Sequence, residues 1–333
     1  MNASTSRWQQ REAEQRAAML ALPTLPVGHH AQLLPPDPGD VRVCASIGPS
    51  GEALALWAAN PEAATQSSLP VRARISTHTA ATTSSTPIDW RPSAHPMIQP
   101  LPDGRVLVVA ARCQWRHAGP EQNAVTYDST GQVCAEQTLG DGIEHVLSTR
   151  QGDVWVGYFD EGVFGNLGWS GTTGPSPLGA AGLVRYDTEL TARWHYPSHS
   201  LHPWGAISDC YALNVTDDAT WTCYYRRFPV VRIQDDTLTW WHNDIRGAKA
   251  LAVDGSRVAL YGGGKAAHDR LATGVLETEG LRVTGEYRLV LPGGEPMPFR
   301  AQVIGRGADL HVVLNTGEWL RLGLDEVPAE SDG

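Results

Sequence analysis

A pair of arginines beside a pair of tyrosines is the first feature of the chain that suggests chemistry. The segment reads YYRRFP from Tyr224, and its basic residues are Arg226 and Arg227. Arginine presents a planar fork of N–H donors that fits carboxylate or phosphate, and tyrosine rings provide a stacking surface. The segment therefore predicts a site for an anionic group. The structural alternative is that one arginine pairs with Asp160 or Glu161 and locks two loops together.

A second candidate combines carboxylates with one histidine. Its members stand at the ends of predicted strands: Glu144, His145, Asp160, Glu161 and Asp209. Carboxylate oxygens suit Ca²⁺, and a histidine suits other divalent ions. The pattern predicts a divalent-cation site, for Ca²⁺ in particular, at the mouth of a central channel. The alternative is that Asp141 and Asp209 accept backbone N–H bonds and that His145 is a packed core residue.

Other long loops carry aromatic and basic residues of the same kind. Together with the first segment they form one predicted ligand-binding set: Trp115, Arg116, His117, Asp160, Glu161, Tyr224, Tyr225, Arg226, Arg227, Lys265 and His268. The run GGGK that ends at Lys265 lacks the spacing of a phosphate-binding loop. The sequence contains neither G-x-S-x-G nor H-E-x-x-H, so no catalytic residue is assigned.

The elements that must position these residues repeat along the chain. Six segments show an apolar run, a turn and a second apolar run, and their turn residues are Gly51, Gly104, Gly152, Asp218, Gly255 and Gly307, at a mean spacing of about 51 residues. A second pair of strands with an acidic turn follows most of them, as in GLVRYDTELTARWHY. Four antiparallel strands per repeat, with no helix between them, predict an all-β fold and a β-propeller. We expect six blades, although a seventh stays open.

The pattern resembles the broad, WD40-like class of β-propellers over residues 40–327. The pairs Tyr127-Asp128 and Tyr186-Asp187 are similar to the third-strand ends of many bacterial propellers. The Gly-His and Trp-Asp signature of the WD40 class itself is absent. The block GDVWVGYFDEG is similar to uncharacterised proteins of high-GC actinobacteria, a resemblance that implies no known activity.

The two ends of the chain differ from the repeats. Helix formers fill residues 1–22 and prolines follow, which predicts an N-terminal helix and a proline-rich extension over residues 1–39. The propeller should then span residues 40–327, and residues 328–333 should form a disordered tail. The last repeat shows only three strands, so we expect the segment before Asp40 to supply the fourth and close the ring.

Propeller topology places the candidate residues on one face. Loops between second and third strands share a face with the links between blades, and the other turns lie on the opposite face. In this sequence the first kind of loop is longer and carries the candidate residues, whereas the turns of the second kind are short. This asymmetry predicts one functional surface, which we call the long-loop face.

Composition narrows the range of partners and compartments. The formal net charge is −10 and no run of basic residues occurs, so we expect no nucleic-acid partner. No run of 18 apolar residues occurs, and we expect no membrane association. The five cysteines include no C-x-x-C motif, which favours a reducing cytoplasm. We expect a soluble monomer.

These observations favour a cytoplasmic binding scaffold that recognises a protein or an anionic small molecule on the long-loop face. The alternative is an enzyme, a metal-assisted hydrolase or lyase that uses His145, Asp160, Glu161 and Asp209 at the channel mouth. An enzyme requires convergent groups with perturbed pKa values in a concave pocket. A scaffold would instead show an aromatic and arginine-rich surface. The sequence leaves this choice open.

Overall fold

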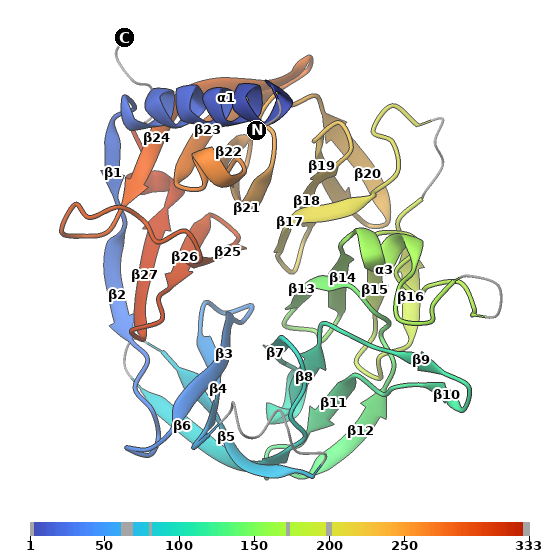
Figure 1. Ribbon diagram of the computed structural model, residues 1–333. Coiled ribbons are helices and arrows are strands. Elements are labelled where there is room, and N and C mark those ends of the chain that lie inside the picture. Colours follow the sequence, from blue (N-terminus) through green and yellow to red (C-terminus); the bar gives the residue numbers. More distant parts are fainter. Residues whose placement is uncertain (1–2, 61–68, 80–81, 171–173, 198–201, 329–333) are drawn as a thin grey trace.

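The computed structural model is a six-bladed β-propeller in which six antiparallel sheets surround a common axis (Figure 1). The structure describes residues 3–60, 69–79, 82–170, 174–197 and 202–328. The predicted all-β class and blade number are confirmed. Residues 329–333 of the predicted disordered tail lie outside the described residues. No described helix is long and apolar enough to cross a membrane.

Each blade contains four strands that run from the axis outward. Those of the first two blades are β3 (Val41–Ile47), β4 (Ala53–Ala58), β5 (Val71–His78), β6 (Thr83–Trp90), β7 (Pro96–Pro100), β8 (Val106–Ala110), β11 (Ala124–Tyr127) and β12 (Val133–Gln137). Those of the third and fourth are β13 (Ile143–Ser148), β14 (Val154–Tyr158), β15 (Leu183–Tyr186), β16 (Ala192–His195), β17 (Asp209–Val215), β18 (Thr220–Tyr225), β19 (Val230–Gln234) and β20 (Thr237–Trp241).

The last two blades combine both ends of the chain. Their strands are β21 (Ala248–Asp254), β22 (Arg257–Gly262), β23 (Arg270–Glu277), β24 (Gly280–Val290), β25 (Gln302–Arg306), β26 (Asp309–Val313) and β27 (Glu318–Gly323). The N-terminal strand β2 (Gly28–Gln32) pairs antiparallel with β27 and is the fourth strand of the sixth blade. The preceding strand, β1 (Thr24–Pro26), pairs parallel with β24 as a fifth strand of the fifth blade.

The N-terminal helix α1 (Ala3–Leu20) lies across the fifth blade (Figure 1). Its Arg16 forms a two-pronged ion pair with Asp269, in which Nη2 lies 2.9 Å from Oδ2. The Asp269 side chain is fully buried, whereas that of Arg16 is 29% exposed. One buried carboxylate thus anchors the helix to the loop between β22 and β23.

The core consists of apolar layers between neighbouring blades. The second strands are buried on both faces because a blade packs on each side of them, and every residue of β4 and β14 is buried. Leu147 and Trp155 of the third blade, for example, pack against Leu213 and Val215 of the fourth. Burial at roughly 25 cal/mol per Å² makes these layers the main source of stability. The outermost strands β12, β16 and β20 are largely exposed.

Near the short turns, an arginine occupies the axis of the ring. Arg306, at the end of β25, donates to the carbonyl oxygens of Ile47 (3.0 Å), Ser148 (2.9 Å) and Val215 (3.1 Å), and to Gln99 Oε1 (2.6 Å). Its side chain therefore joins the sixth blade to the first four. Burial lowers the pKa of Arg306 to about 9, so the guanidinium stays charged at neutral pH.

Candidate functional site

The long-loop face carries the predicted site residues, but the structure distributes them over the loops of four blades. The hairpin β9 (Trp115–Arg116) and β10 (Gly119–Pro120) stands on the second blade, and the short helix α3 (Asp160–Phe164) on the third. The 3-10 turn η2 (Lys265–Ala267) belongs to the fifth blade. The segment after Tyr225 belongs to the fourth blade.

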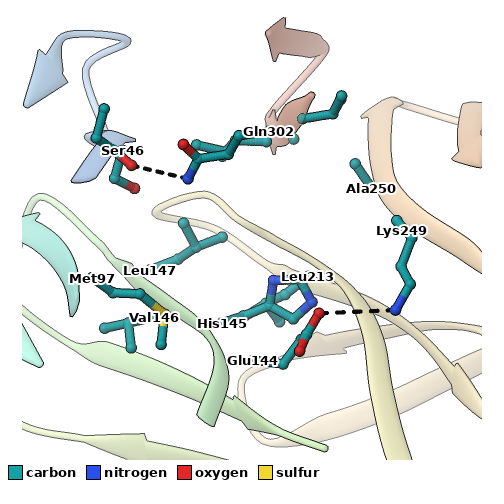
Figure 2. Close-up of a pocket in the computed structure, with 14 residues that line it drawn as sticks. Ser46, Met97, Glu144, His145, Val146, Leu147, Leu213, Lys249, Ala250 and Gln302 are labelled. Atoms are coloured by element: carbon teal, nitrogen blue, oxygen red, sulfur yellow. Dashed lines mark hydrogen bonds and ion pairs between the residues drawn. The ribbon is translucent and has the colours of Figure 1, made fainter. Parts of the chain in front are cut away.

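The channel mouth, formed by Glu144, Asp209 and Lys249, lies where the inner strands begin. Below it is a cavity of about 60 Å³ that inner-strand residues of all six blades line. Figure 2 shows Glu144 facing Lys249, with 3.8 Å between Oε1 and Nζ. The Lys249 ammonium also lies 4.4 Å from the centroid of the Tyr211 ring. Burial raises the pKa of Asp209 to about 6; the carboxylates of Glu144 and Asp160 add to this effect, and Lys249 opposes it.

His145 is held against the fourth blade rather than presented to a ligand. Its Nε2 donates to the carbonyl oxygen of Tyr211 over 3.1 Å. The ring also lines the axial cavity (Figure 2). Burial lowers the pKa of His145, against the opposing effect of Glu144. These contacts favour the structural interpretation, a packed and hydrogen-bonded histidine.

The five predicted metal ligands do not converge. Within the described part of the chain, no three His, Cys, Asp or Glu side chains are placed to hold one ion. Glu144 faces Lys249, Glu161 faces Arg112, and His145 bonds to a backbone carbonyl. Among the described residues the predicted Ca²⁺ site therefore has no ligand set, and of the four predicted carboxylate ligands only Asp160 and Asp209 form no ion pair there.

An arginine that the sequence analysis did not single out locks the loops of the second and third blades. Arg112 binds Asp141 with two N–H groups, at 2.8 and 3.0 Å, and Glu161 with a third contact of 2.6 Å. Asp141 is 3% exposed and also accepts the backbone N–H of Cys113. Glu161 thus takes part in the predicted loop lock, but its partner is neither Arg226 nor Arg227.

The hairpin residues of the second blade make local contacts. Trp115 packs edge-on against Trp169, with 5.4 Å between ring centroids, and Trp169 donates to the Cys113 carbonyl. Arg116 pairs with Glu121 at 2.7 Å. His117 is exposed at the turn of the hairpin. This part of the predicted set therefore stabilises its own loop.

Lys265 and His268 lie beneath the N-terminal helix. The Lys265 ammonium is 3.5 Å from the Glu12 carboxylate of α1. The His268 ring lies 3.2 Å from the carbonyl oxygen of Met297 and packs edge-on against Phe299. Lys265 and His268 are not part of the lining that contains Arg227, so their role in binding the same ligand stays a prediction.

The two tyrosines at the end of β18 have different roles. Tyr224 is fully buried, and its hydroxyl lies 2.6 Å from that of Tyr196. Its assignment to the ligand-binding set is therefore wrong. Tyr225 is 42% exposed, because successive side chains of a strand point to opposite sides. Only the second tyrosine reaches the surface.

Tyr225 borders a cavity of about 400 Å³ where the chain passes from the fourth to the fifth blade. We call it the basic pocket; its lining residues are Tyr225, Arg227, Phe228, His242, Asn243, Asp244 and Arg246. Tyr225, Phe228 and the neighbouring Tyr211 form one aromatic cluster, with ring centroids 5.7 to 6.5 Å apart. Asn243 fixes the wall by donating to the carbonyl oxygens of Phe228 and Ile245.

The formal charge of the described residues that line the basic pocket is positive, because the lining contains Arg227 and Arg246 but one carboxylate, Asp244. Among the described residues, no carboxylate forms an ion pair with Arg226, Arg227 or Arg246. The Arg226 guanidinium lies 5.8 Å from the Tyr225 ring centroid, and Arg227 donates to the Pro203 carbonyl over 2.9 Å. The one acidic residue in the lining, Asp244, lies 3.2 Å from His242.

The sequence analysis missed the half of this pocket that the segment WHNDIRG supplies. That segment joins the fourth blade to the fifth, and its His242, Asp244 and Arg246 follow no periodic pattern. The available signal was topological. A link between blades opens on the same face as the loop that carries Arg226 and Arg227, so basic residues in both should have been considered together.

Similarity to known proteins assigns no function to this chain. Residues 201–260 match the YxzG family, which covers less than half of the chain. No curated protein matches the sequence. Among solved structures, the chain is similar to XC5397, a gluconolactonase from Xanthomonas campestris (TM-score 0.44, 10% identity, 87% of this chain and 99% of that one). It is also similar to a luciferin-regenerating enzyme (TM-score 0.44, 13% identity, 89% of this chain and 94% of that one).

A third similar structure is a functionally unknown protein from Desulfotomaculum acetoxidans (TM-score 0.48, 9% identity, 85% of this chain and 83% of that one). These propeller-like proteins differ in function, and none of their activities is transferred to this chain. The expected resemblance to actinobacterial proteins receives no support.

Proposed function

We propose that this protein is a binding module for a small anionic ligand, and that the ligand binds in the basic pocket between the fourth and fifth blades. The observation that carries the proposal is the pair of arginines in its lining, Arg227 and Arg246, with Arg226 next to them in sequence; none of the three has a carboxylate partner among the described residues. In a chain with a formal net charge of −10, positive charge gathered in one concave lining is suited to an anionic ligand.

Two of the arginines are held in place by contacts that leave most N–H donors free. An aromatic ring attracts a guanidinium without accepting its hydrogen bonds, which applies to Arg226 over Tyr225. Arg227 uses one N–H group on the Pro203 carbonyl. A guanidinium fixed in this way loses less conformational entropy when it binds carboxylate or phosphate, because part of the ordering cost is met in the free protein.

The dimensions of the pocket favour a small molecule over a protein. A volume of about 400 Å³ falls in the range typical of small-molecule sites, ~300–1,000 Å³. Two aromatic rings and a few polar groups in one concave lining are also typical of such sites. The alternative of a metal-assisted hydrolase or lyase stays an untested prediction, because no ligand set supports it in the described part of the chain.

Isothermal titration with inorganic phosphate and with citrate tests this proposal. We expect wild-type protein to bind at least one of them, and Arg227→Gln/Arg246→Gln to weaken binding about tenfold or more for each arginine removed. The matched control is Arg116→Gln, on the same face and paired with Glu121. If the double variant binds both anions as the wild type does, the proposal is wrong.

A further inference from the structure

We propose that the ligand of the basic pocket is an organic anion that carries a planar ring on its acidic group. This inference rests on the proposed function and adds the chemical class of the ligand. It follows from the second half of the pocket lining, the rings of Tyr225 and Phe228, which share one cavity with Arg227 and Arg246.

The two rings form an angled wall. Their centroids are 5.8 Å apart and their planes meet at 57°. Aromatic rings prefer offset-stacked and edge-to-face contacts with centroids ~4.5–7 Å apart. A planar ring placed in this angle can stack on one wall ring while it directs its edge at the other. A saturated ring has no flat π face and fits the same space without these contacts.

The rings of Tyr225 and Phe228 are packed against neighbouring residues. Tyr211 lies behind both rings, at 6.5 Å and 20° from Tyr225 and at 5.7 Å and 48° from Phe228. The carbonyl of Phe228 accepts an N–H group of the buried Asn243, which holds the backbone at this position. Both rings thus have packed neighbours in the structure, and Tyr225 is 42% exposed although it is a large aromatic residue.

The charged and aromatic walls are suited to different parts of one molecule. Guanidinium groups recognise the oxygens of a phosphate or carboxylate, and ring walls recognise a flat apolar body. An inorganic anion would use only the first wall and leave most of the roughly 400 Å³ to water. Aryl phosphates and aryl carboxylates use both walls, and the shared chemistry is an acidic group attached to an aromatic ring.

Titration at pH 8 with inorganic phosphate, cyclohexyl phosphate and phenyl phosphate tests the ring, since phosphate monoesters are mostly dianions there. We expect phenyl phosphate to bind at least tenfold more tightly than inorganic phosphate and about threefold or more tighter than cyclohexyl phosphate. Benzoate against acetate is the second arm, and shows whether a carboxylate can replace the phosphate.

Phe228→Leu keeps apolar volume and removes the ring. It should lower the preference for phenyl over cyclohexyl phosphate to near unity and leave the affinity for inorganic phosphate within twofold. The matched control is Phe164→Leu, an exposed phenylalanine of α3 on the same face, which should behave as the wild type. Tyr225→Leu is a second ring variant, in case Phe228→Leu lowers the melting temperature.

The ring comparison tests the planar-ring inference, and the arginine double variant tests the proposed function, so the two can fail separately. Equal affinity for phenyl and cyclohexyl phosphate, or no gain over inorganic phosphate, would overturn the planar-ring inference. If the arginine double variant then still loses phosphate binding, the proposed function stands. If no anion binds, or if the arginine variant binds like the wild type, both are wrong.

Discussion

Arg306 Nη2 lies 2.6 Å from Gln99 Oε1, and this contact joins the sixth blade to the second at the centre of the ring. Gln99 is fully buried. Its amide also donates to Ser46 and accepts from the backbone and hydroxyl of Ser148. One amide thus links four blades. This propeller is closed by contacts at the axis as well as by the pairing of β2 with β27, which joins the two ends of the chain.

Gln99→Leu tests this central network. The change leaves N–H groups of Arg306 and Ser148 buried without acceptors, so we expect a loss of about 2–4 kcal/mol in the free energy of unfolding. Urea denaturation followed by circular dichroism measures it. The matched control is Gln137→Leu on the exposed strand β12, which should stay within ~0.5 kcal/mol. Equal losses in the two variants would contradict the account.

Arg16→Met tests the anchor of the N-terminal helix. The variant leaves the carboxylate of Asp269 buried without its cation, which should cost roughly 3 kcal/mol at pH 7. Arg11→Met, at an exposed position of the same helix, is the control and should cost under ~0.5 kcal/mol. Deletion of residues 1–39, which removes β1 and β2 as well, should destabilise the protein far more than either substitution.

The Arg16 contribution should depend on pH in a defined direction. Burial alone raises the pKa of Asp269, but the hydrogen bonds and charge of Arg16 outweigh it and the net pKa is lowered. A lowered folded-state pKa stabilises the protein above the unfolded value of about 3.9, and this stability is lost as pH falls through the folded value. In Arg16→Met the burial that raises the pKa of Asp269 is no longer opposed by Arg16, so the carboxyl of the variant takes up a proton at higher pH and part of the destabilisation is relieved. The gap between wild type and Arg16→Met should therefore narrow from pH 7 to pH 4. A gap that is constant or widens would contradict the assignment.

Arg112 joins the loops of the second and third blades through Asp141 and Glu161. Changing Arg112 and changing Glu161 should have unequal effects on the free energy of unfolding. Arg112→Met leaves Asp141 buried without its cation, so we expect a loss of about 2–4 kcal/mol. Glu161→Gln should cost much less than Arg112→Met, because the Glu161 side chain is 41% exposed and Asp141 still holds the arginine. Chemical denaturation of both variants provides the comparison, and a larger loss for Glu161→Gln would refute the lock.

Cysteine reactivity should divide the five thiols into two groups. Burial raises the pKa of four of them to about 12, namely Cys44, Cys113, Cys210 and Cys223. Because the thiolate is the reactive form, we expect only the exposed Cys134 to react with Ellman's reagent in native protein at pH 8. Denatured protein should release the signal of all five. Rapid native labelling of a second cysteine would be inconsistent with this burial.

The fold was predictable because its signals are local and repeated. A hairpin turn needs a residue that tolerates positive φ, and Gly255 and Gly307 adopt φ of 58° and 53° at two of the six predicted turns. Each turn between two apolar runs marks one blade. The missing strand of the last repeat also pointed to a partner elsewhere in the chain, and β2 occupies that position beside β27.

The site was predictable only in part, because it depends on side-chain direction and on neighbours distant in sequence. Tyr224 and Tyr225 are adjacent, and only strand register decides which one is buried. Arg112 and Arg226 both follow apolar strands, yet only the first faces a carboxylate of the next blade. Such pairings depend on the rotation between blades, which no local pattern encodes.

The central claim is that an anionic ligand binds in the basic pocket. The most direct test is to determine the position of a bound anion in a crystal structure. Crystals grown with selenate would locate the ion from the anomalous signal of selenium. The account predicts a selenate in the basic pocket, within hydrogen-bond distance of Arg227 and Arg246, and its loss in Arg227→Gln/Arg246→Gln. Selenate bound elsewhere on the long-loop face, with the basic pocket empty, would contradict the account.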